Sequence, residues 1–587
     1  MYLYKSICKN PKVYISENYR DHNKITRRRI IKDCGYVSDL IEKYGDNYKK
    51  VLMNEIQKIT EDNKIQICLE LSKPKENNTV LNYGYFFIDK FYKQLKIDTF
   101  IYEISKEYQF KYDLNNIMKL LIFSRILKPE SKLKTWENRN KFFESFDVDL
   151  KDIYRSLNVM CNIKEDLQLH IHKQITDKYG RDCHLMFYDV TNYYFETDYD
   201  DEDIINNETG EVQQGFRKKG VCKSNTQKPL VAMGLLIDRN GIPVAYKLFK
   251  GNTSDSNTLI PVLSELKEKY EIERVITTAD KGLNSGNNLG FITLNNDGYI
   301  VSQKIRGSNK EFIDIVLNQE GYIYNQSKTH KSKSIIRERE VKFSGIVNGK
   351  IYENEPVKLK EKVVIFWSKD YDDRMKYKRK DLSLKIEKYK ENPSLFKAGN
   401  TYGIKRYFKT KEIDEKTGKE VKGKTKLIFD EEKYNRDMAL DGYYAIITSE
   451  INLSNNEIIS RYRGLSEIED SFRVLKSDLE GRPVYVRLKD HIEGHFLICY
   501  ISLVITRLLQ YELNKNNSKK EPKVSPQKIQ EALNLAMCKN IGSGIYSLNK
   551  STETLEKLLL YNDITLTEYM RYEVINNKRE KIIYNRK

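Results

Sequence analysis

The spacing of apolar positions divides the chain into segments of different secondary structure. Up to about residue 180 the pattern is mainly helical; apolar residues recur at helical spacing from Ile117 to Ile126, and Pro129 ends that run. From about Asp182 the period changes to two. The segment CHLMFYDVTNYYFET is rich in aromatic and β-branched residues and therefore predicts a strand. Two further strands follow, joined by a turn at Asn240–Gly241.

The next segments alternate between helix and strand and then change character. A helix over 259–270, the strand RVITTAD, a second helix and the strand GYIVSQKI complete an α/β core. Beyond it, GYIYN, VVIFWS and TKLIFD suggest a strand-rich, lysine-dense insertion. The strand GYYAIITS then leads into a long helix from Asn456 to about Leu479, and the tail from about Ile492 is again helical.

These changes of pattern predict an α/β protein with five regions. They are a helical N-terminal region (1–180), the first part of the core (181–305), a β-rich insertion (306–440), the second part of the core with the long helix (441–490) and a helical C-terminal region (491–587).

Composition adds a preference for partners. A hydrophobic content of 39% and a charged content of 32% are typical of soluble globular proteins. The net charge of +18 favours polyanionic partners, nucleic acid before an anionic membrane surface. A basic soluble protein without such a partner stays an alternative, because heavy use of Lys, Ile, Asn and Tyr also suggests an AT-rich genome. No secretory signal is visible, the apolar stretch Phe496–Thr506 is too short to span a bilayer, and the scattered cysteines fit a reducing cytoplasm.

Two aspartates stand where an α/β core places functional acids. Asp189 lies within an apolar, aromatic strand, where a carboxylate is costly unless a metal ion, a hydrogen bond or solvent compensates it. Asp280 ends a strand, and ligands of open α/β sheets collect beyond the carboxyl ends of strands. Aspartate is also a common turn former. Taken singly, each residue is as compatible with a structural role as with a functional one.

A third acid can be placed on its helix. An apolar stripe runs along this helix through Leu465, Ile468, Phe472, Leu475 and Leu479. Residues seven apart return to nearly the same angle, so Tyr462, Glu469 and Lys476 form one column beside that stripe. An ordinary amphipathic helix with solvated Glu and Lys is the alternative. Together the three acids suit Mg²⁺, which takes oxygen ligands and, as a pair of ions, supports in-line displacement at phosphorus. No P-loop sequence is present.

The long helix resembles the signature of bacterial insertion-sequence transposases of the Asp-Asp-Glu class, Tyr-x2-Arg-x3-Glu-x6-Lys. Tyr462, Glu469 and Lys476 match it; position 465 is Leu where the signature has Arg, and Arg463 or Arg473 would take that role. The segments FYDVTNYYFE, TADKG, SRILKPESK and RPVY, the last with His491 and His495, are similar to the branch of this family that carries a long insertion.

The resemblance implies an RNase H-like core and a Mg²⁺-dependent transposase. Asp189, Asp280 and Glu469 would be catalytic and hold two Mg²⁺ ions, for which Mn²⁺ can substitute. The partners would be the terminal inverted repeats and the target, both double-stranded DNA, held by a homodimer, in the cytoplasm of a bacterium. Sequence recognition is expected in the N-terminal region. The residues predicted to contact DNA are Tyr462, Arg463, Arg473, Lys476, Lys218, Lys219 and Lys223.

Two other functions are compatible with the same residues. One is an RNase H-like nuclease that cuts DNA without strand transfer, and the other is a non-catalytic DNA-binding protein derived from a mobile element. Family members that excise through a hairpin use an aromatic residue to hold a flipped base. Trp367 is a candidate by residue type, although its place in VVIFWS favours a strand core.

Overall fold

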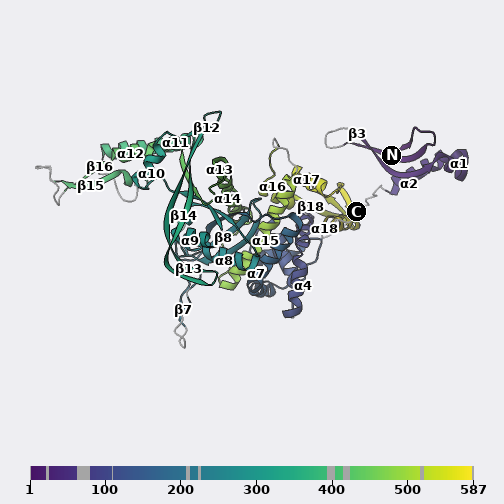
Figure 1. Cartoon of the computed structure of the whole chain (residues 1–587). Coiled ribbons are helices and arrows are strands. Elements are labelled where there is room, and N and C mark those ends of the chain that lie inside the picture. The colour runs from purple at the N-terminus through teal and green to yellow at the C-terminus, as the bar shows by residue number, and fades with distance from the viewer. Residues whose placement is uncertain are drawn as a thin grey trace. The chain divides into compact units, whose positions relative to one another are not determined.

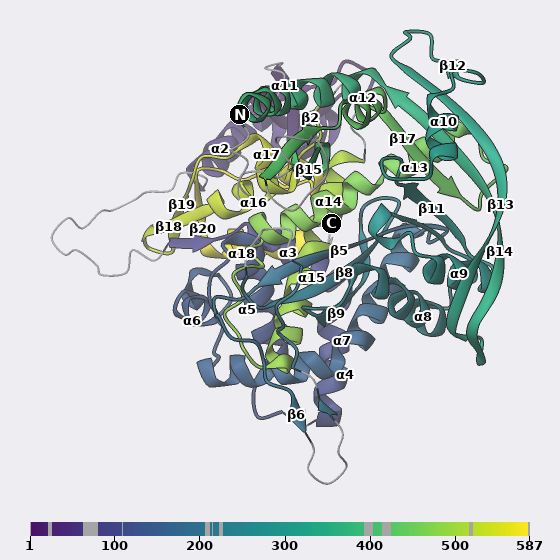
Figure 2. The ribbon, with the colours of Figure 1, turned by 90° about the vertical axis from the view of Figure 1, so that its left-hand side faces the viewer.

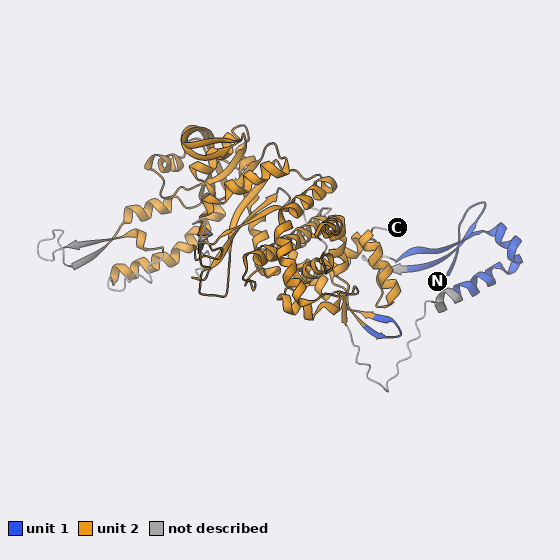
Figure 3. Cartoon of the chain, turned by 90° about the horizontal axis from the view of Figure 1, so that it is seen from below, with its two compact units in different colours: residues 1–78, 540–546 blue, residues 79–539, 547–587 orange. Residues whose placement is uncertain are grey.

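The computed structural model describes most of the chain. It covers residues 2–20, 26–62, 80–108, 110–205, 212–213, 215–221, 227–392, 403–413, 424–515 and 521–584. The chain forms two compact units (Figures 1 and 3). Unit 1 comprises Met1–Asn78 with Asn540–Tyr546, and unit 2 comprises Thr79–Lys539 with Ser547–Lys587.

Unit 1 begins with strands and corrects the prediction of a helical region over 1–180. β1 (Tyr2–Lys5), β2 (Lys12–Arg20) and β3 (Thr26–Tyr36) form an antiparallel sheet, followed by α1 (Val37–Tyr44) and α2 (Tyr48–Asp62). β2 is a strand because its side chains alternate between the two faces of the sheet: Val13 and Ile15 are buried, and Tyr14 between them is partly exposed. Helical structure in unit 2 then runs from residue 85 to residue 179, as predicted.

The helices before the core pack around one long helix of the C-terminal part. They are α3 (Tyr85–Gln94), α4 (Ile97–Tyr108), α5 (Leu114–Leu127), α6 (Lys132–Glu137) and α7 (Leu150–Tyr179). Both α5 and α7 pack against α15 (Lys489–Asn514). The apolar length of α15 would suffice to cross a membrane, and its most apolar window is wholly buried inside the protein. The longest apolar stretch therefore belongs to a 26-residue core helix.

A nine-stranded mixed sheet is the centre of unit 2 in the described part of the chain. Its strands are β5 (Leu185–Tyr194), β8 (Leu230–Asp238), β9 (Pro243–Lys250), β10 (Ile276–Ala279), β11 (Gly298–Gln303), β12 (Ile323–Tyr324), β13 (His330–Val347), β14 (Lys350–Ser368) and β17 (Tyr443–Thr448). Their order is β12-β13-β14-β17-β11-β10-β5-β8-β9. β8 is antiparallel to both β5 and β9, whereas β10 and β11 run parallel to β5. This confirms the predicted α/β class.

Helices cover both faces of this sheet. α8 (Leu259–Tyr270) and α9 (Gly286–Leu294) share a buried cluster with Met186, Tyr188 and Val301 on one face. The opposite face carries Ile276 and Ile300, against which the helix that begins the long helical segment packs. That segment is divided into α13 (Asn455–Arg463), α14 (Leu465–Arg473) and a π-helical turn over Val474–Asp478, in place of the single helix predicted.

In the described part of the insertion over 306–440, which was predicted to be β-rich, strands are accompanied by helices that were not predicted. After α10 (Lys310–Leu317), the hairpin β13–β14 extends the central sheet by pairing β14 with β17 (Figure 2). The remainder comprises α11 (Lys369–Glu391), β15 (Phe408–Ile413), β16 (Lys424–Phe429) and α12 (Glu431–Ala439). The 23 residues of α11 are mostly charged, and the apolar stripe of Leu382, Ile386 and Tyr389 is confined to the second half of the helix.

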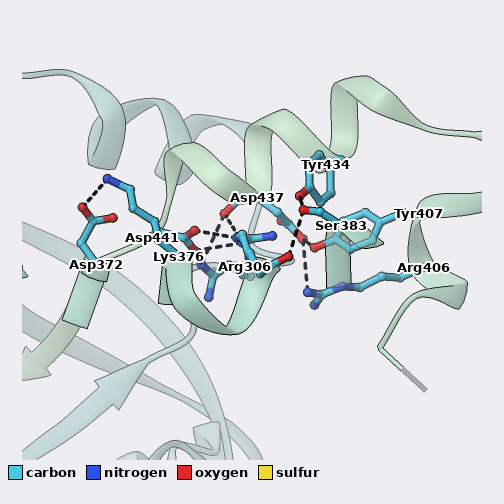
Figure 4. Close-up of polar contacts among 10 residues, drawn as sticks. Arg306, Asp372, Lys376, Ser383, Arg406, Tyr407, Tyr434, Asp437 and Asp441 are labelled. Atoms are coloured by element: carbon cyan, nitrogen blue, oxygen red, sulfur yellow. Dashed lines mark hydrogen bonds and ion pairs between the residues drawn. The ribbon is translucent and has the colours of Figure 1, made fainter. Parts of the chain in front are cut away.

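A polar network fastens α11 to the end of the insertion (Figure 4). Asp441 is buried and accepts hydrogen bonds from Arg306 at 2.5 Å and from Arg379 of α11 at 2.5 and 2.9 Å. Tyr407 donates to Asp437 of α12 at 2.8 Å. Two guanidinium groups thus surround one buried carboxylate. This network adds to the apolar cluster of Ile386, Ile404 and Tyr407 that also joins α11 to the rest of the insertion.

The C-terminal region also contains strands where only helices were predicted. After α15 come α16 (Pro526–Leu535), β18 (Met537–Gly542), β19 (Ile545–Leu548), α17 (Glu553–Tyr561), β20 (Tyr569–Arg571) and α18 (Tyr572–Tyr584). β18 pairs with β4 (Val80–Asn82), from the opposite end of unit 2 in the sequence. Short strands of this kind have too few residues to show a clear period. β6 (Ile204–Ile205) and β7 (Val212–Gln213) form an antiparallel pair.

Candidate active site

Strand register brings the two predicted aspartates side by side. In the parallel pair of β5 and β10, Ala279 lies opposite Tyr188 as the last paired position. One residue further along both strands are Asp189 and Asp280, on strands that lie about 4.8 Å apart. Neighbouring residues in register project from the same face of a sheet, so both carboxylates belong to the face that carries Ile276.

The row continues onto the next strand with a residue that sequence reasoning missed. Val301 of β11 lies opposite Ala279, so Ser302 follows in register with Asp280. The Ser302 hydroxyl donates a hydrogen bond to Asp280 Oδ1 at 3.1 Å. The sequence alone could have placed Ser302 beside Asp280 only if the register between the strands RVITTAD and GYIVSQKI had been known.

The helical segment places the third acid over the same face. Gly464, between α13 and α14, lies directly on Phe187 of β5: a Cβ atom built on Gly464 would stand 2.3 Å from Phe187 Cζ. This close approach fixes the start of α14, on which Glu469 is exposed to solvent. Tyr462, at the end of α13, is partly buried.

The electrostatics of Tyr462 connect all three acids. Burial is the first cause that raises the pKa of the Tyr462 phenol, to about 12; a hydrogen bond with Ser302 lowers it, and the negative charges of Asp280, Glu469 and Asp189 raise it further. One phenol therefore lies within electrostatic range of the three predicted catalytic carboxylates. At neutral pH it stays protonated and can donate a hydrogen bond.

The donor set suits a hard cation, although the acids are not gathered into a closed site. Asp280 and Glu469 are exposed and Asp189 is partly buried, and all three offer carboxylate oxygens, the ligands that Mg²⁺ and Mn²⁺ prefer. Among the described residues, no three His, Cys, Asp or Glu side chains are placed to hold a metal ion.

Comparison with known proteins identifies the family. The family model described as "Transposase DDE domain" matches residues 197–505, more than half of the 587 residues. The chain belongs to this transposase family. Asp280 and Glu469 lie inside the matched range, whereas Asp189 precedes it by eight positions. No curated protein matches the chain.

Solved structures of a transposase also show weak similarity to this transposase. A Mos1 transposase paired-end complex with left transposon end and a pre-cleavage Mos1 transpososome are each 11% identical, with 45% of this chain and 70% of that chain covered and a TM-score of 0.14. A Mos1 mariner paired-end complex with Mn is 12% identical, with 42% and 67% covered and a TM-score of 0.11. TM-scores this low do not support any conclusion about the fold or function of this chain.

The other signature positions of this transposase differ in how they are held. Lys476, in the π-helical turn, donates a hydrogen bond to Thr191, two residues after Asp189 on β5. Arg473 forms ion pairs with Asp470 at 2.9 Å and Asp478 at 3.1 Å. Its guanidinium is therefore already bound by carboxylates.

Of the two arginines proposed for the signature's arginine role, only Arg473 is paired with carboxylates among the described residues; Arg463 is not. It is exposed and lines a groove of about 590 Å³ together with Trp367 and Lys331. The Lys331 ammonium stands 5.7 Å from the centre of the Trp367 ring. Position 465, where the signature has arginine, is a buried leucine. Trp367 is partly buried on β14.

The predicted basic loop of the transposase is only partly available to DNA. Lys218 donates to Asp203 at 2.7 Å and to the Asp201 carbonyl oxygen at 2.8 Å. Its charge is thus committed to an ion pair, which does not favour the predicted contact with DNA. Lys219 is exposed. Lys223 lies outside the described residues.

Proposed function

We propose that the chain is a Mg²⁺-dependent DNA transposase of the cut-and-paste type, with Asp189, Asp280 and Glu469 as its metal-binding carboxylates. The proposal rests on the register of β5 and β10, which aligns Asp189 with Asp280. It is supported by Tyr462, whose pKa is raised by the charges of all three acids. The order of the first five core strands supports an RNase H-like core, since three antiparallel strands are followed by two parallel ones on the far side of β5.

The reaction would proceed at two phosphodiesters in turn. Two divalent ions bound by the carboxylates would activate the attacking oxygen and stabilise the leaving oxygen. Asp280, oriented by Ser302, would present a fixed oxygen to this site, and Asp189 would present another from the adjacent strand. In the first step water would attack a phosphodiester at the terminal inverted repeat, breaking the P–O3′ bond and leaving a 3′-hydroxyl and a 5′-phosphate. In the second step that 3′-hydroxyl would attack a phosphodiester of target DNA, and the target strand's own 3′ oxygen would leave.

Tyr462 and Lys476 would position the strand. Both lie beside the carboxylates, one with a protonated phenol and the other with an ammonium group, and both can donate to phosphate oxygens. Contacts of this type fix the register of DNA without reading its sequence. Joining two ends of an element requires two active sites, so a homodimer on DNA is part of the proposal, acting on chromosomal or plasmid DNA in the cytoplasm.

The test is Glu469→Gln, assayed by Mg²⁺-dependent nicking of duplex DNA that carries the sequence flanking the gene. Glutamine keeps the size of the side chain and removes the charge that a divalent ion needs, so nicking should fall by at least a hundredfold. Glu467→Gln, two residues away on α14, is the matched control and should retain native nicking. Undiminished nicking by Glu469→Gln contradicts the assignment.

The products distinguish transposition from simple cleavage. A transposase joins the cleaved 3′ ends to a supercoiled target plasmid, whereas a nuclease leaves them free. A DNA-binding protein without catalysis would show neither product at any Mg²⁺ or Mn²⁺ concentration. Joined products that depend on both Asp189 and Asp280 are expected.

A further inference from the structure

A pocket of about 320 Å³ lies beside the end of the proposed catalytic segment, within unit 2. Arg125 at the end of α5, Lys132 at the start of α6 and His495 of α15 line it, together with Arg482 from the segment after the π-helical turn. Two sequence motifs that the catalytic assignment does not use, SRILKPESK and RPVY, thus meet at one place.

The pocket contains two buried basic side chains without a carboxylate partner. Lys132 is 6% exposed and Arg125 is 7% exposed, and neither forms an ion pair within the part of the chain that the structure describes. The Lys132 ammonium nitrogen lies 3.3 Å from His495 Nδ1. Among the described residues Arg125 donates to main-chain oxygens alone, those of Leu479 at 3.2 Å and Glu480 at 3.3 Å.

The acids at the rim do not neutralise these groups. Glu130 accepts a hydrogen bond from Asn138 at 2.7 Å and lies 3.3 Å from the Lys128 ammonium, and Glu480 is exposed to solvent. A second buried lysine in the same layer of helices shows the usual arrangement. Lys119, 4% exposed, is paired with Glu144 and with Asp89. An unpaired buried cation is costly, so the Lys132 site lacks a negative charge that another molecule can supply.

The pKa values of Lys132 and His495 are both lowered, as expected for basic groups in a pocket that lacks an anionic partner. Burial, and then the charge of Arg125, lower the pKa of the Lys132 ammonium to about 7. Burial and the same two cations hold the pKa of His495 well below its ordinary value. An anion in the pocket would reverse these shifts, because an opposite charge favours the charged form of each group.

The pocket lies along the strand that carries Asp189. Gly481, just before Arg482, approaches the ring of Tyr193, and the Arg482 guanidinium is 5.7 Å from the centre of the Tyr194 ring. Tyr194 stands five positions after Asp189 along β5, a span of about 16 Å. Duplex DNA rises 3.4 Å per base pair, so the pocket would meet the backbone roughly five steps from the cleaved phosphodiester.

We propose that this pocket binds one phosphate group of the DNA backbone, with Lys132, Arg125 and Arg482 as its donors. The inference rests on the proposed function in one respect, that the substrate is DNA. It assigns the two motifs a role in holding the strand beside the catalytic carboxylates, which contributes affinity and position but no sequence readout.

The first experiment measures how duplex DNA binding by the full chain depends on salt. Each phosphate contact contributes about 0.9 to the slope of log K against log salt, so Lys132→Met should reduce the slope by about 0.9 and weaken binding about eightfold at 0.1 M salt. Lys132→Arg should retain the slope. Lys151→Met removes an exposed lysine that is paired with Asp149 and should also leave the slope unchanged.

The second experiment measures thermal unfolding with inorganic phosphate against chloride at equal ionic strength. Phosphate should raise the unfolding temperature of the native chain and not that of Lys132→Met, because ligand binding stabilises the folded state. Without phosphate, Lys132→Met should be at least as stable as the native chain, since no carboxylate loses its partner. If Lys132→Met does not fold, Arg482→Gln is measured in its place by both methods.

The outcomes separate this inference from the proposed function. An unchanged slope in Lys132→Met, or an equal loss in Lys151→Met, overturns the pocket assignment even if the native chain nicks DNA. Stabilisation by phosphate with an unchanged DNA slope also overturns it, because the pocket would then hold a free anion. A reduced slope in a chain that never nicks DNA supports the pocket and contradicts the catalytic proposal.

Discussion

The contact between Gly464 and Phe187 offers a direct way to test whether helix placement controls catalysis. Gly464 has helical torsion angles, φ −60° and ψ −15°, so alanine is allowed by the backbone. The obstacle is space. The added Cβ would stand 2.3 Å from Phe187 Cζ and 2.6 Å from Cε1, whereas non-bonded carbons prefer about 3.5–4.0 Å. Phe187 is 3% exposed on a central strand and has no room to yield.

The geometry sets the expected size of the effect. The start of α14 must move away from β5 by about 1 Å, and Glu469 moves with it while Asp189 stays on the strand. A displacement of about 1 Å can reduce a reaction rate about a hundredfold, equivalent to about 2.7 kcal/mol in the barrier. Overpacking should also lower the free energy of unfolding by about 1–3 kcal/mol.

The assay compares Gly464→Ala with Gly286→Ala in Mg²⁺-dependent nicking and in chemical denaturation. At Gly286, the first residue of α9, the added Cβ meets Val341 at 3.4 Å, an ordinary contact. The control should keep native activity and gain up to about 1 kcal/mol of stability, because alanine favours helix. Native nicking rates in Gly464→Ala would refute the argument that this contact positions Glu469.

Two further predictions concern the second catalytic strand and the response to acid. Ser302→Ala removes the hydrogen bond to Asp280. It should raise the Mg²⁺ concentration for half-maximal nicking roughly tenfold, because groups that orient a metal ligand change metal affinity by this order. An unaltered Mg²⁺ titration would show that Ser302 does not orient Asp280. Burial, with Arg181 and Lys173 nearby, lowers the pKa of His172 to about 3, so the unfolded chain takes up a proton before the folded chain does. The free energy of unfolding should therefore fall as the pH drops from about 6.5 toward 3, at up to about 1.4 kcal/mol per pH unit, and denaturation of His172→Gln should lack this part of the slope.

The hydrophobic pattern of the sequence was sufficient to predict a strand or helix where that single element shows a regular period. The period of two around Asp189 and the strand that ends at Asp280 were predicted, and both strands are present. The helical character of the segment with Tyr462, Glu469 and Lys476 was also predicted, whereas its division at Gly464 and at the π-helical turn was not. These features follow from side-chain periodicity, which depends only on neighbours in the sequence.

Segments whose order depends on other parts of the chain were predicted less well. The strands over residues 2–36 and the helix α11 were missed, because their apolar side chains are few or are interrupted by charge. α11 is held in part by Arg379 and the buried Asp441, a contact between residues 62 positions apart. Propensity and hydrophobic period contain no information about such a partner.

The amino-acid sequence alone determined the residue types, the strands and the helix on which the proposed chemistry depends. Only the tertiary structure decided that Asp189, Asp280 and Ser302 stand in one row, because the register between strands is set by the packing of the whole sheet. Only the tertiary structure shows the pocket as well, because Arg125 and Lys132 line it with Arg482 and His495, which lie more than 340 positions later in the sequence. Contacts over such separations depend on how α5, α6 and α15 pack, and that packing is a property of the folded chain rather than of any one segment.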